Sequence, residues 1–447
     1  MPHDRKTTAD AEGSARGRRR VVVIGGGFAG LACAGELGNA EVECVVIDRR
    51  NHNLFQPLLY QVATAALSPA DIAEPIRKTL ASYKNIEMIM AEVVGIDTAK
   101  RRVLLADGAD VRYDQLVIAT GSEYDYFGHD EWQALAPGLK TIHEAREIRH
   151  RLLLAFEKAE RAGSPAEKQA LLTSIIIGGG PTGVEMAGAI SELGRFMISR
   201  DFRNLQPDHL RVLLVEAGPR ILAAFPEHLS AYAARYLEKI GVEVRTGSRV
   251  VDITKDGANI GGAFISAGSI VWGAGVKASP AHRWLGLSGT AGNRIPVDDH
   301  LRVQGFEDIY ALGDTAALIG TDGKPLPALA QVAKQQGIYL GRHLRKETVI
   351  SGPGFVFRNR GNTAVIGRNA AVFDFGRWTL KGRLAWLLWA IVHVYLLINF
   401  EKRLLVSIQW IWRYLTRQRG ARIIDESAGQ TATRAPEVSP AMQAGKI

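Results

Sequence analysis

The stretch VVVIGGGFAG, Val21–Gly30, joins a run of apolar residues to a Gly-x-Gly-x-x-Gly motif. Four apolar residues in a row, all of them β-branched, predict a strand buried on both faces of a parallel sheet. The first glycine of the motif permits a tight strand-to-helix turn, the second lets backbone approach a pyrophosphate, and the third lets helix pack on strand. The stretch therefore predicts a βαβ unit that binds a dinucleotide at the N-terminus of its helix.

A second motif of the same kind follows about 150 residues later, where Ser174–Ile177 leads into Gly178, Gly180 and Gly183. One such motif is weak evidence by itself. Two of them, each with an apolar strand before it and an acidic residue after it, indicate two dinucleotide sites. The sequence thus predicts an α/β fold with two Rossmann-like domains.

Acidic residues end the next apolar strand after each motif, and they indicate which nucleotides bind. Asp48 ends the strand Glu43–Ile47, and Glu216 ends the strand Arg211–Val215. A carboxylate at this place binds ribose hydroxyls and repels a 2′-phosphate, so NADH is expected rather than NADPH. Arg220 lies close by in the sequence and leaves some NADPH binding open, and either acid could be a solvated strand end.

A third segment, Asp308–Asp314, is a short apolar strand that ends in Gly-Asp. Together with Leu116–Gly121 it resembles the two segments that complete the FAD domain in the two-dinucleotide-binding-domain flavoproteins, whose fold is glutathione-reductase-like. In that superfamily FAD occupies the N-terminal motif. The resemblance implies that the second motif holds NADH and that hydride passes from the nicotinamide to the flavin.

Within that superfamily the chain resembles the type II, non-proton-pumping NADH:quinone oxidoreductases from about residue 20 to about residue 422. The stretches that carry this resemblance are Asn51–Ala63, Ala119–Ser122 with Tyr126–Gly128, Gly178–Glu185, Val271–Val276 and Pro327–Gly337. It implies a membrane-associated FAD enzyme that passes electrons from NADH to ubiquinone or menaquinone. The chain departs from the family at Asn362, where members often have a hydroxyl residue. The family's quinone-pocket polarity is therefore not carried over to this position.

The motifs and the resemblance together give the candidate cofactor-binding residues. Those expected at FAD are Gly25, Gly27, Phe28, Ala29, Gly30, Asp48, Arg49, Gln56, Ala119, Thr120, Gly121, Gly313, Asp314, Ala330 and Gln331. Those expected at NADH are Gly178, Gly180, Pro181, Thr182, Gly183, Glu185, Glu216 and Gly275. No metal site is expected.

Four residues are candidates for the chemistry itself. The helix expected to start near Ala328 resembles one that points its positive end at the flavin, where Gln331, Gln335 and Gln336 would serve a quinone head group. Glu185 is expected on the first turn of the helix after the second motif, and the resemblance gives it a role in substrate binding or proton delivery. The alternatives are a solvated helix face for the glutamines and simple helix stabilisation for Glu185.

Length and composition agree with a nested two-domain enzyme. The 447 residues carry only two cysteines, Cys33 and Cys44, both expected as small core residues, so neither disulfide reduction nor persulfide chemistry can be placed in this chain. The expected organisation is a disordered arm, a first FAD segment, an NADH domain, a second FAD segment, a C-terminal membrane-associated region and a disordered tail. Their ranges are 1–19, 20–145, 146–279, 280–345, 346–425 and 426–447.

The C-terminal region combines apolar residues with positive charge. Residues 384–400 are apolar except for His393 and Asn399, and as one helix of about 25 Å they would fall short of a bilayer core of about 30 Å. From 377 to 422 there are nine Lys and Arg residues and one acid, with five of the eight tryptophans. This mixture favours an anionic bilayer surface over nucleic acid, and a homodimer contact is compatible with it.

The sequence thus predicts a non-electrogenic NADH:quinone oxidoreductase, peripheral or monotopic on the cytoplasmic face of the inner membrane. Two rival functions stay open at this point. One is a soluble NADH-dependent reductase of a ferredoxin-like protein or a dye, and the other is a redox flavoprotein of the apoptosis-inducing-factor type.

Overall fold

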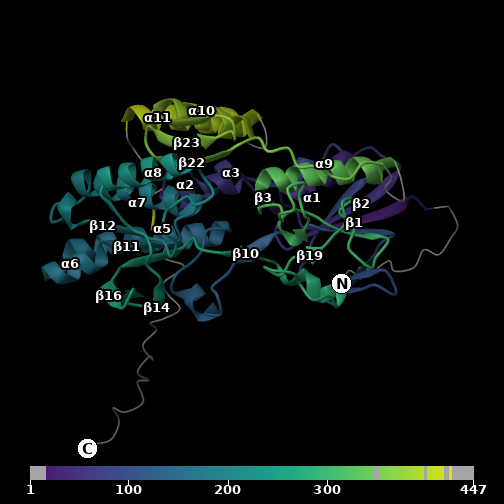
Figure 1. Cartoon of the computed structure of the whole chain (residues 1–447), viewed down its shortest axis with the longest axis horizontal. Helices are drawn as coiled ribbons and strands as arrows, with labels where there is room; N and C mark the ends of the chain where they lie inside the picture. The colour runs from purple at the N-terminus through teal and green to yellow at the C-terminus, as the bar shows by residue number, and fades with distance from the viewer. Residues whose placement is uncertain (1–16, 347–351, 397–399, 417–421, 425–447) are drawn as a thin grey trace, which may run out of the picture. The chain divides into compact units, whose positions relative to one another are not determined.

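A computed structural model describes residues 17–346, 352–396, 400–416 and 422–424 (Figure 1). The expected tail 426–447 and most of the expected arm lie outside these residues. The chain divides into two compact units. The first comprises Met1–Phe55, Ala73–Asp125 and Gly275–Gly361, and the second comprises Gln56–Ile72, Tyr126–Ala274 and Asn362–Ile447. Residues 56–72 and 126–145, expected in the first FAD segment, group with the second motif, and residues 275–279, expected in the NADH domain, group with the first.

The first unit is built on a parallel sheet of five strands in the order β20-β9-β1-β2-β5. β1 begins two residues before the expected strand, and the expected segments 116–118 and 309–311 both join it in this sheet. The helix after β1 packs along α9. The bounds are β1 Arg19–Ile24, α1 Phe28–Leu37, β2 Val42–Asp48, β5 Ile86–Met90, β9 Gln115–Ile118, β20 Ile309–Ala311 and α9 Ala330–Lys346.

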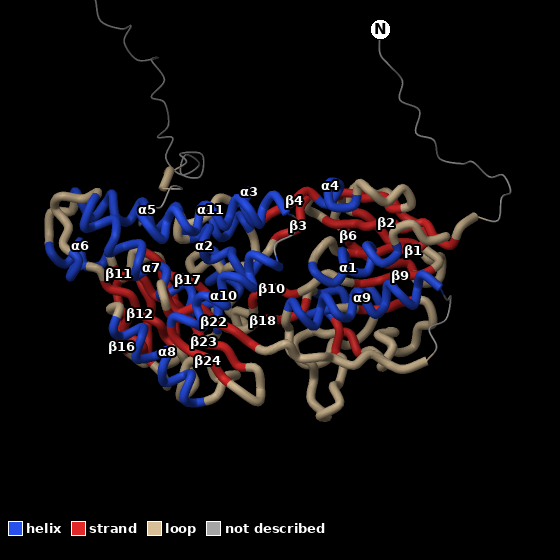
Figure 2. Tube along the Cα trace, turned by 90° about the horizontal axis from the view of Figure 1, so that it is seen from above, coloured by secondary structure: helices blue, strands red, loops and turns tan. Residues whose placement is uncertain are grey.

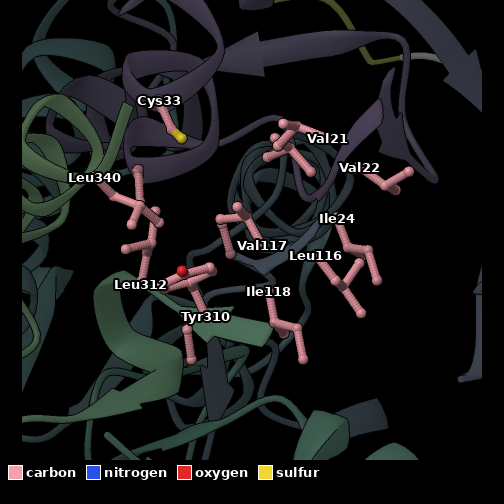
Figure 3. Packing of buried hydrophobic residues seen from close by; sticks show 14 of the residues in the cluster. Val21, Val22, Ile24, Cys33, Leu116, Val117, Ile118, Tyr310, Leu312 and Leu340 are labelled. Carbon is pink, nitrogen blue, oxygen red and sulfur yellow. The ribbon is translucent and has the colours of Figure 1, made fainter. Parts of the chain in front are cut away.

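The core of this unit fills the space between the sheet and the two helices (Figure 3). Val21, Val22, Leu116 and Leu340 are fully buried there. Cys33 and Cys44 are buried, free thiols, as expected, and burial raises the pKa of both. A strand that is covered on both faces carries apolar residues at every position. This explains why apolar and polar residues do not alternate in the strand before the first motif.

Smaller elements complete the first unit. They are the hairpin of β3 His52–Leu54 and β4 Ala73–Pro75, the helix α4 Ile76–Leu80, the meander of β6 Val93–Asp97, β7 Arg102–Leu105 and β8 Asp110–Arg112, and the pairs of β10 Ser122–Tyr124 with β18 Val276–Ala278 and β19 Ile295–Pro296 with β21 Ala316–Ala317.

The second unit repeats the parallel plan with four strands in the order β13-β12-β11-β17. Figure 2 labels β11, β12 and β17 of this sheet. The helices α7 and α8 pack on β12 and β13, and α5 packs on β17. The bounds are α2 Leu59–Ala63, α3 Pro69–Ile72, α5 Ile142–Arg161, α6 Pro165–Leu171, β11 Thr173–Ile177, α7 Pro181–Arg200, β12 Arg211–Val215, α8 Glu227–Lys239, β13 Val242–Arg245, β14 Val250–Thr254, β15 Gly257–Ile260, β16 Ala263–Ser266 and β17 Ser269–Trp272.

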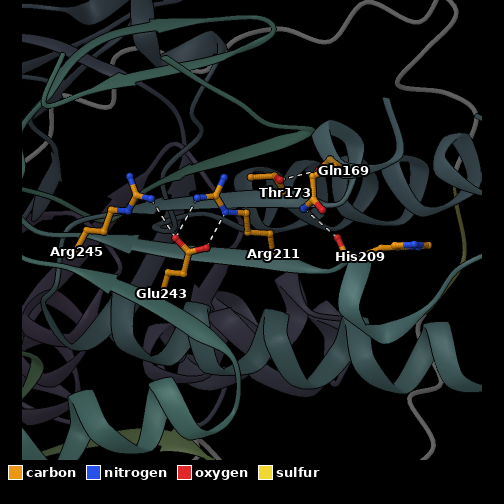
Figure 4. A network of polar contacts seen from close by, with 6 residues as sticks. All are labelled: Gln169, Thr173, His209, Arg211, Glu243 and Arg245. Atoms are coloured by element: carbon orange, nitrogen blue, oxygen red, sulfur yellow. Dashed lines mark hydrogen bonds and ion pairs between the residues drawn. The ribbon is translucent and has the colours of Figure 1, made fainter. Parts of the chain in front are cut away.

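Polar contacts tie two of these strands together (Figure 4). Glu243 of β13 binds Arg211 of β12 at 2.7 Å and Arg245 at 3.2 Å, and the two guanidinium groups lower the pKa of Glu243. Arg211 opens β12, whereas Glu216 follows its other end. Arg245 is the last residue of β13, so the network links the neighbouring strands β12 and β13.

The described residues after 361 form a small antiparallel sheet on which α10 packs, while α11 packs on α10 and α3, and they are seen in yellow-green in Figure 1. The structure differs here from the sequence prediction, because the single helix expected over 384–400 ends at Leu396 and a second helix begins at Phe400. His393, a polar residue within the apolar run 384–400, is buried and contacts Trp389. Burial lowers the pKa of His393 to about 4, which keeps the imidazole neutral. The bounds are β22 Asn362–Gly367, β23 Ala370–Asp374, β24 Thr379–Gly382, α10 Arg383–Leu396 and α11 Phe400–Thr416.

Among the described residues, no helix has both the length and the apolar character needed to cross a bilayer.

Candidate functional site

The two glycine motifs form nearly identical turns, one in each unit. Gly25 and Gly178 adopt left-handed φ values of +107° and +104°. A Cβ atom on Gly30 would lie 1.8 Å from the Gly25 carbonyl oxygen, and a Cβ on Gly183 would lie 1.8 Å from that of Gly178. Any side chain at the third glycine would therefore push the helix off the strand.

The middle glycine of each motif faces open space. A Cβ on Gly27 or Gly180 would meet no atom within 4 Å, and neither α1 nor α7 has a side chain that caps its N-terminus. Uncapped N–H groups beside an open surface are what a diphosphate needs. Phe28 and Ala29 begin α1, and Pro181 and Thr182 begin α7, so the residues present fit a dinucleotide at both motifs.

The two acidic residues occupy equivalent places as well. One oxygen of Asp48 accepts the N–H of Gly26 at 2.6 Å and the other accepts that of Arg50 at 2.7 Å. One oxygen of Glu216 accepts the N–H of Gly179 at 2.6 Å and the other accepts that of Gly218 at 2.7 Å. Each carboxylate is thus fixed by backbone while keeping lone pairs for two ribose hydroxyls. Arg49 follows Asp48 directly in the sequence.

Arg220 is committed elsewhere, although it stands close to Glu216 in the sequence. Its guanidinium donates to the carbonyl oxygens of Leu222, Ala223 and Phe225 at 3.3, 2.7 and 2.8 Å. These bonds hold the turn that leads into α8. An arginine used in this way is not available to a 2′-phosphate, a point that sequence distance alone did not reveal.

The third segment closes the first site with a group of hydroxyl residues. The hydroxyl of Ser122 donates to Asp314 at 2.5 Å, and the N–H of Gly121 donates to Thr315 at 2.9 Å. Thr120 contacts both Ser279 and Thr315. Ala119 and Gly121 thus lie on the strand end that meets Gly313 and Asp314, as the superfamily resemblance implied.

Glu185 has a different environment from the one expected. It lies on the second turn of α7, not the first, and accepts the N–H of Val365 from β22 at 3.3 Å. The residue keeps some exposed surface, but its carboxyl group is closely surrounded by protein. That burial raises the pKa of Glu185 to about 8, and the Val365 N–H lowers it in part. The carboxyl is therefore mostly protonated at pH 7.

The three glutamines of α9 are all engaged. The amide of Gln331 bonds the backbone of Arg360 and Gly361, each at 3.1 Å, and that of Gln335 bonds both backbone groups of Arg358. Gln336 is buried and accepts the N–H of Gly313 at 2.6 Å. The sequence predicted a shared face for Gln331 and Gln335, but it gave no sign of these backbone partners. α9 begins at Ala330.

Two further candidates belong to the opposite unit from the motif they were expected to serve. Gln56, expected at FAD, opens a short 3-10 helix in the second unit. Gly275, expected at NADH, has a φ of +65° and begins the last segment of the first unit.

Comparison with known proteins accounts for this arrangement. The pyridine nucleotide-disulphide oxidoreductase family model matches residues 19–337, and the NDH2 C-terminal domain matches residues 359–419. The chain is 35% identical to the type II NADH:quinone oxidoreductase Ndh of Mycobacterium tuberculosis, over 94% of each chain. It belongs to the type II NADH:quinone oxidoreductases.

A second relative supports this membership, and a solved structure shows the same fold. NdhA, a second type II NADH:quinone oxidoreductase of M. tuberculosis, is 37% identical over 91% of this chain and 90% of its own. The solved structure of NDH2 from Plasmodium falciparum in complex with NADH superposes with a TM-score of 0.82 at 21% identity, covering 91% of this chain and all of that one. The resemblance that the sequence motifs indicated is confirmed, and with it the enzyme class and the two cofactors, FAD and NADH.

Proposed function

We propose that this type II NADH:quinone oxidoreductase oxidises NADH at the second motif, holds FAD at the first, and delivers the electrons to a lipid quinone without moving protons across the membrane. The observation that carries the proposal is the duplicated site: two motifs with the same turn, the same open middle glycine and the same backbone-held carboxylate. FAD supplies the chemistry, since it accepts hydride and releases electrons singly or in pairs. The protein supplies binding, orientation and electrostatics.

The proposed FAD site comprises the α1 turn, Asp48, the hydroxyl group of Thr120 and the Gly313–Asp314 turn. Gln336 contributes by holding the N–H of Gly313 in place. The proposed NADH site comprises the α7 turn and Glu216. Gln331 and Gln335 are proposed at the quinone, where a carbonyl of the head group would replace one of their present backbone partners.

Glu185 is proposed to hold and move a proton during turnover. A carboxyl group with a pKa of about 8 is largely protonated at neutral pH, yet it ionises within the range in which general acids work well. Reduction of a quinone consumes two protons, so a neutral acid on α7 suits the reaction better than a permanent carboxylate would.

Turnover with three acceptors tests the proposal. Purified protein should contain FAD and oxidise NADH rapidly with a short-chain quinone, and it should do so slowly with a ferredoxin. Fast reduction of the ferredoxin with no quinone activity would favour the soluble reductase. A reduced flavin that forms a long-lived complex with NAD⁺ and turns over slowly with either acceptor would favour the apoptosis-inducing-factor type.

Nucleotide choice gives a first mutational prediction. The wild-type enzyme should prefer NADH to NADPH in kcat/KM by at least about tenfold, about 1.4 kcal/mol, because Glu216 repels a 2′-phosphate. Glu216→Ser should bring the ratio towards one without reversing it, since the Arg220 guanidinium is already bound to three carbonyl groups. Steady-state kinetics with both nucleotides measure the ratio, and a variant that prefers NADPH strongly would show that Arg220 is free to turn.

The C-terminal helices carry an exposed apolar surface, which we call the α10–α11 patch. Its members are 42% to 70% exposed, and they are Leu384, Leu387, Ile391, Tyr395, Leu396, Leu404, Leu405, Ile408, Ile411 and Trp412. Trp389 and Trp410 stack at 5.3 Å beneath it, and the indole N–H of Trp410 donates to Gln61 at 3.0 Å. These inward contacts hold the two helices on the second unit, while the apolar side chains of the patch stay exposed.

We assign an anionic bilayer surface to this patch. Arg377, Lys381, Arg383 and Arg403 precede or lie within the two helices in the sequence. Exposed apolar side chains with basic residues nearby bind lipid interfaces by burial and by charge together. The bilayer is proposed to be the inner membrane, with the protein on its cytoplasmic face, where NADH is produced. A second copy of the chain is the competing occupant.

Surface variants test the patch while sparing the core. Leu387→Ser with Ile391→Ser and Ile408→Ser should lower binding to vesicles containing anionic lipid by about tenfold or more, because each loses exposed apolar area that would be buried in the interface. High salt should release the wild type only partly, since salt screens charge and leaves apolar burial intact. Sedimentation with vesicles measures both. Unchanged vesicle binding with a lost dimer in light scattering would assign the patch to a second copy.

A further inference from the structure

One face of α7 is in contact with the edge of β22, and we call this contact the α7–β22 seam. β22 pairs with β23 on one side only, so its other edge needs partners for its backbone groups. Glu185 accepts the N–H of Val365, and Glu192 accepts the N–H of Arg368. Residues 185, 188 and 192 lie on one helical face, because three to four residues make one turn.

Between the two carboxylates the helix has a glycine. A Cβ atom on Gly188 would lie 1.8 Å from the carbonyl oxygen of Ile366 and 2.9 Å from its carbonyl carbon. Both are backbone atoms of a paired strand, so they cannot rotate away as the end of a side chain can. Gly188 is therefore what lets the strand edge reach the two glutamates.

The neighbourhood of this seam is otherwise well anchored. The hydroxyl of Tyr236 on α8 donates to the carbonyl oxygen of Arg368 at 2.7 Å, and Ala364 and Ile366 are fully buried. A methyl group at 188 must then move β22 relative to α7 or strain the helix, since the sheet has no free direction in which to yield. In either case the Val365 N–H moves relative to the carboxyl of Glu185.

We propose that Gly188 is a positioning residue for Glu185: by admitting the carbonyl of Ile366, it docks β22 on α7 and so fixes the carboxyl group that acts in turnover. This inference rests on the proposed role of Glu185. It assigns a second task to the C-terminal domain, which starts at this strand and thereby reaches the nucleotide-binding helix as well as the membrane.

Hydrogen exchange tests the seam without turnover. Gly188→Ala should speed exchange of the Val365 and Arg368 amides by about tenfold or more, because both lose the glutamate side chains that accept their hydrogen bonds. Gly194→Ala is the matched control on the same helix, where the new methyl would meet the side chains of Leu210 and Phe156 and not β22. Equal exchange in Gly188→Ala and the wild type would overturn the close approach.

A double-mutant cycle then tests positioning. Gly188→Ala should lower quinone-dependent kcat by about tenfold in the wild-type background and by less than about twofold in a Glu185→Gln background, since the two changes act on one group. Equal losses in both backgrounds would make the glycine merely structural and overturn the inference. Glu192→Ala, which loosens the seam without adding atoms, should give a smaller loss with the same dependence on Glu185, even if Gly188→Ala fails to fold.

Failure of the proposed function is distinguishable from failure of the seam. Wild-type kcat in Glu185→Gln would overturn the role of Glu185 and this inference with it, whatever the exchange rates show. A large loss of kcat in Glu185→Gln, together with unchanged amide exchange in Gly188→Ala, would overturn the role of the seam and leave the role of Glu185 intact.

Discussion

Gly183→Ala is expected to give a yellow protein that NADH no longer reduces. The new Cβ would lie 1.8 Å from the carbonyl oxygen of Gly178, so α7 must move away from the turn that holds the pyrophosphate. The flavin should stay bound, because the first motif belongs to the other unit. We expect anaerobic flavin bleaching by NADH to slow by about 10²-fold or more in stopped-flow, given that misplacement by about 1 Å costs this much, while dithionite reduces the flavin normally.

Gly30→Ala is the mirror experiment, since its Cβ would meet Gly25 in the same way. This variant should purify largely without flavin. Gly35→Ala, on the same helix but with open space around its Cβ, should keep full flavin content and full activity. Loss of flavin from Gly183→Ala, with normal flavin in Gly30→Ala, would reverse the assignment of the two cofactors.

Glu185→Gln is expected to have the second-largest effect. Glutamine can still accept the Val365 N–H, but it cannot transfer a proton, and loss of a general acid typically costs 10²-fold or more in rate. Quinone-dependent kcat should fall by about 10²-fold, while NADH binding, judged from KM and from flavin bleaching, should change little. A variant with wild-type kcat between pH 6 and 8 would contradict the assignment.

The same substitution should change how stability depends on pH. The pKa of Glu185 is raised by burial to about 8 in the folded protein, above the value near 4.5 of the unfolded chain. Folding therefore holds a proton that the unfolded chain releases, and wild-type stability falls as pH rises from about 5 to 8. The Glu185→Gln variant should lose less stability as pH rises, because glutamine does not titrate. Its unfolding free energy relative to wild type should therefore rise by about 1–3 kcal/mol over that range. Denaturant titrations at several pH values measure this difference.

Most of the nucleotide-binding architecture could be predicted from local sequence patterns. The apolar strands before Gly25 and Gly178, and the acids Asp48 and Glu216, could be recognised because spacing along the chain fixes their geometry. The superfamily segment at Gly313 likewise fell where expected, beside the strand that ends at Ile118.

What could not be predicted depends on partners distant in the sequence. Glu185 becomes a buried acid only because β22, almost 200 residues later, lies on α7. In the sequence Gln331 and Gln335 look like a solvated pair. In the structure their side-chain amides form hydrogen bonds with the backbone near residue 360. Arg220 looked available to a nucleotide because its partners are backbone carbonyl groups, and the pattern of side chains in a sequence does not reveal such partners. Sequence spacing shows which residues share a face, but not what covers that face.

The one-sided pairing of β22 also limits how the protein can be divided. Cutting the chain before Asn362 would leave Glu185 and Glu192 without their backbone donors, and it would leave the C-terminal sheet with a bare edge. An uncovered strand edge is a template for association with other chains. The C-terminal domain is therefore a poor candidate for excision or for transplantation onto another flavoprotein, unless the recipient helix offers the same small residue between two acids.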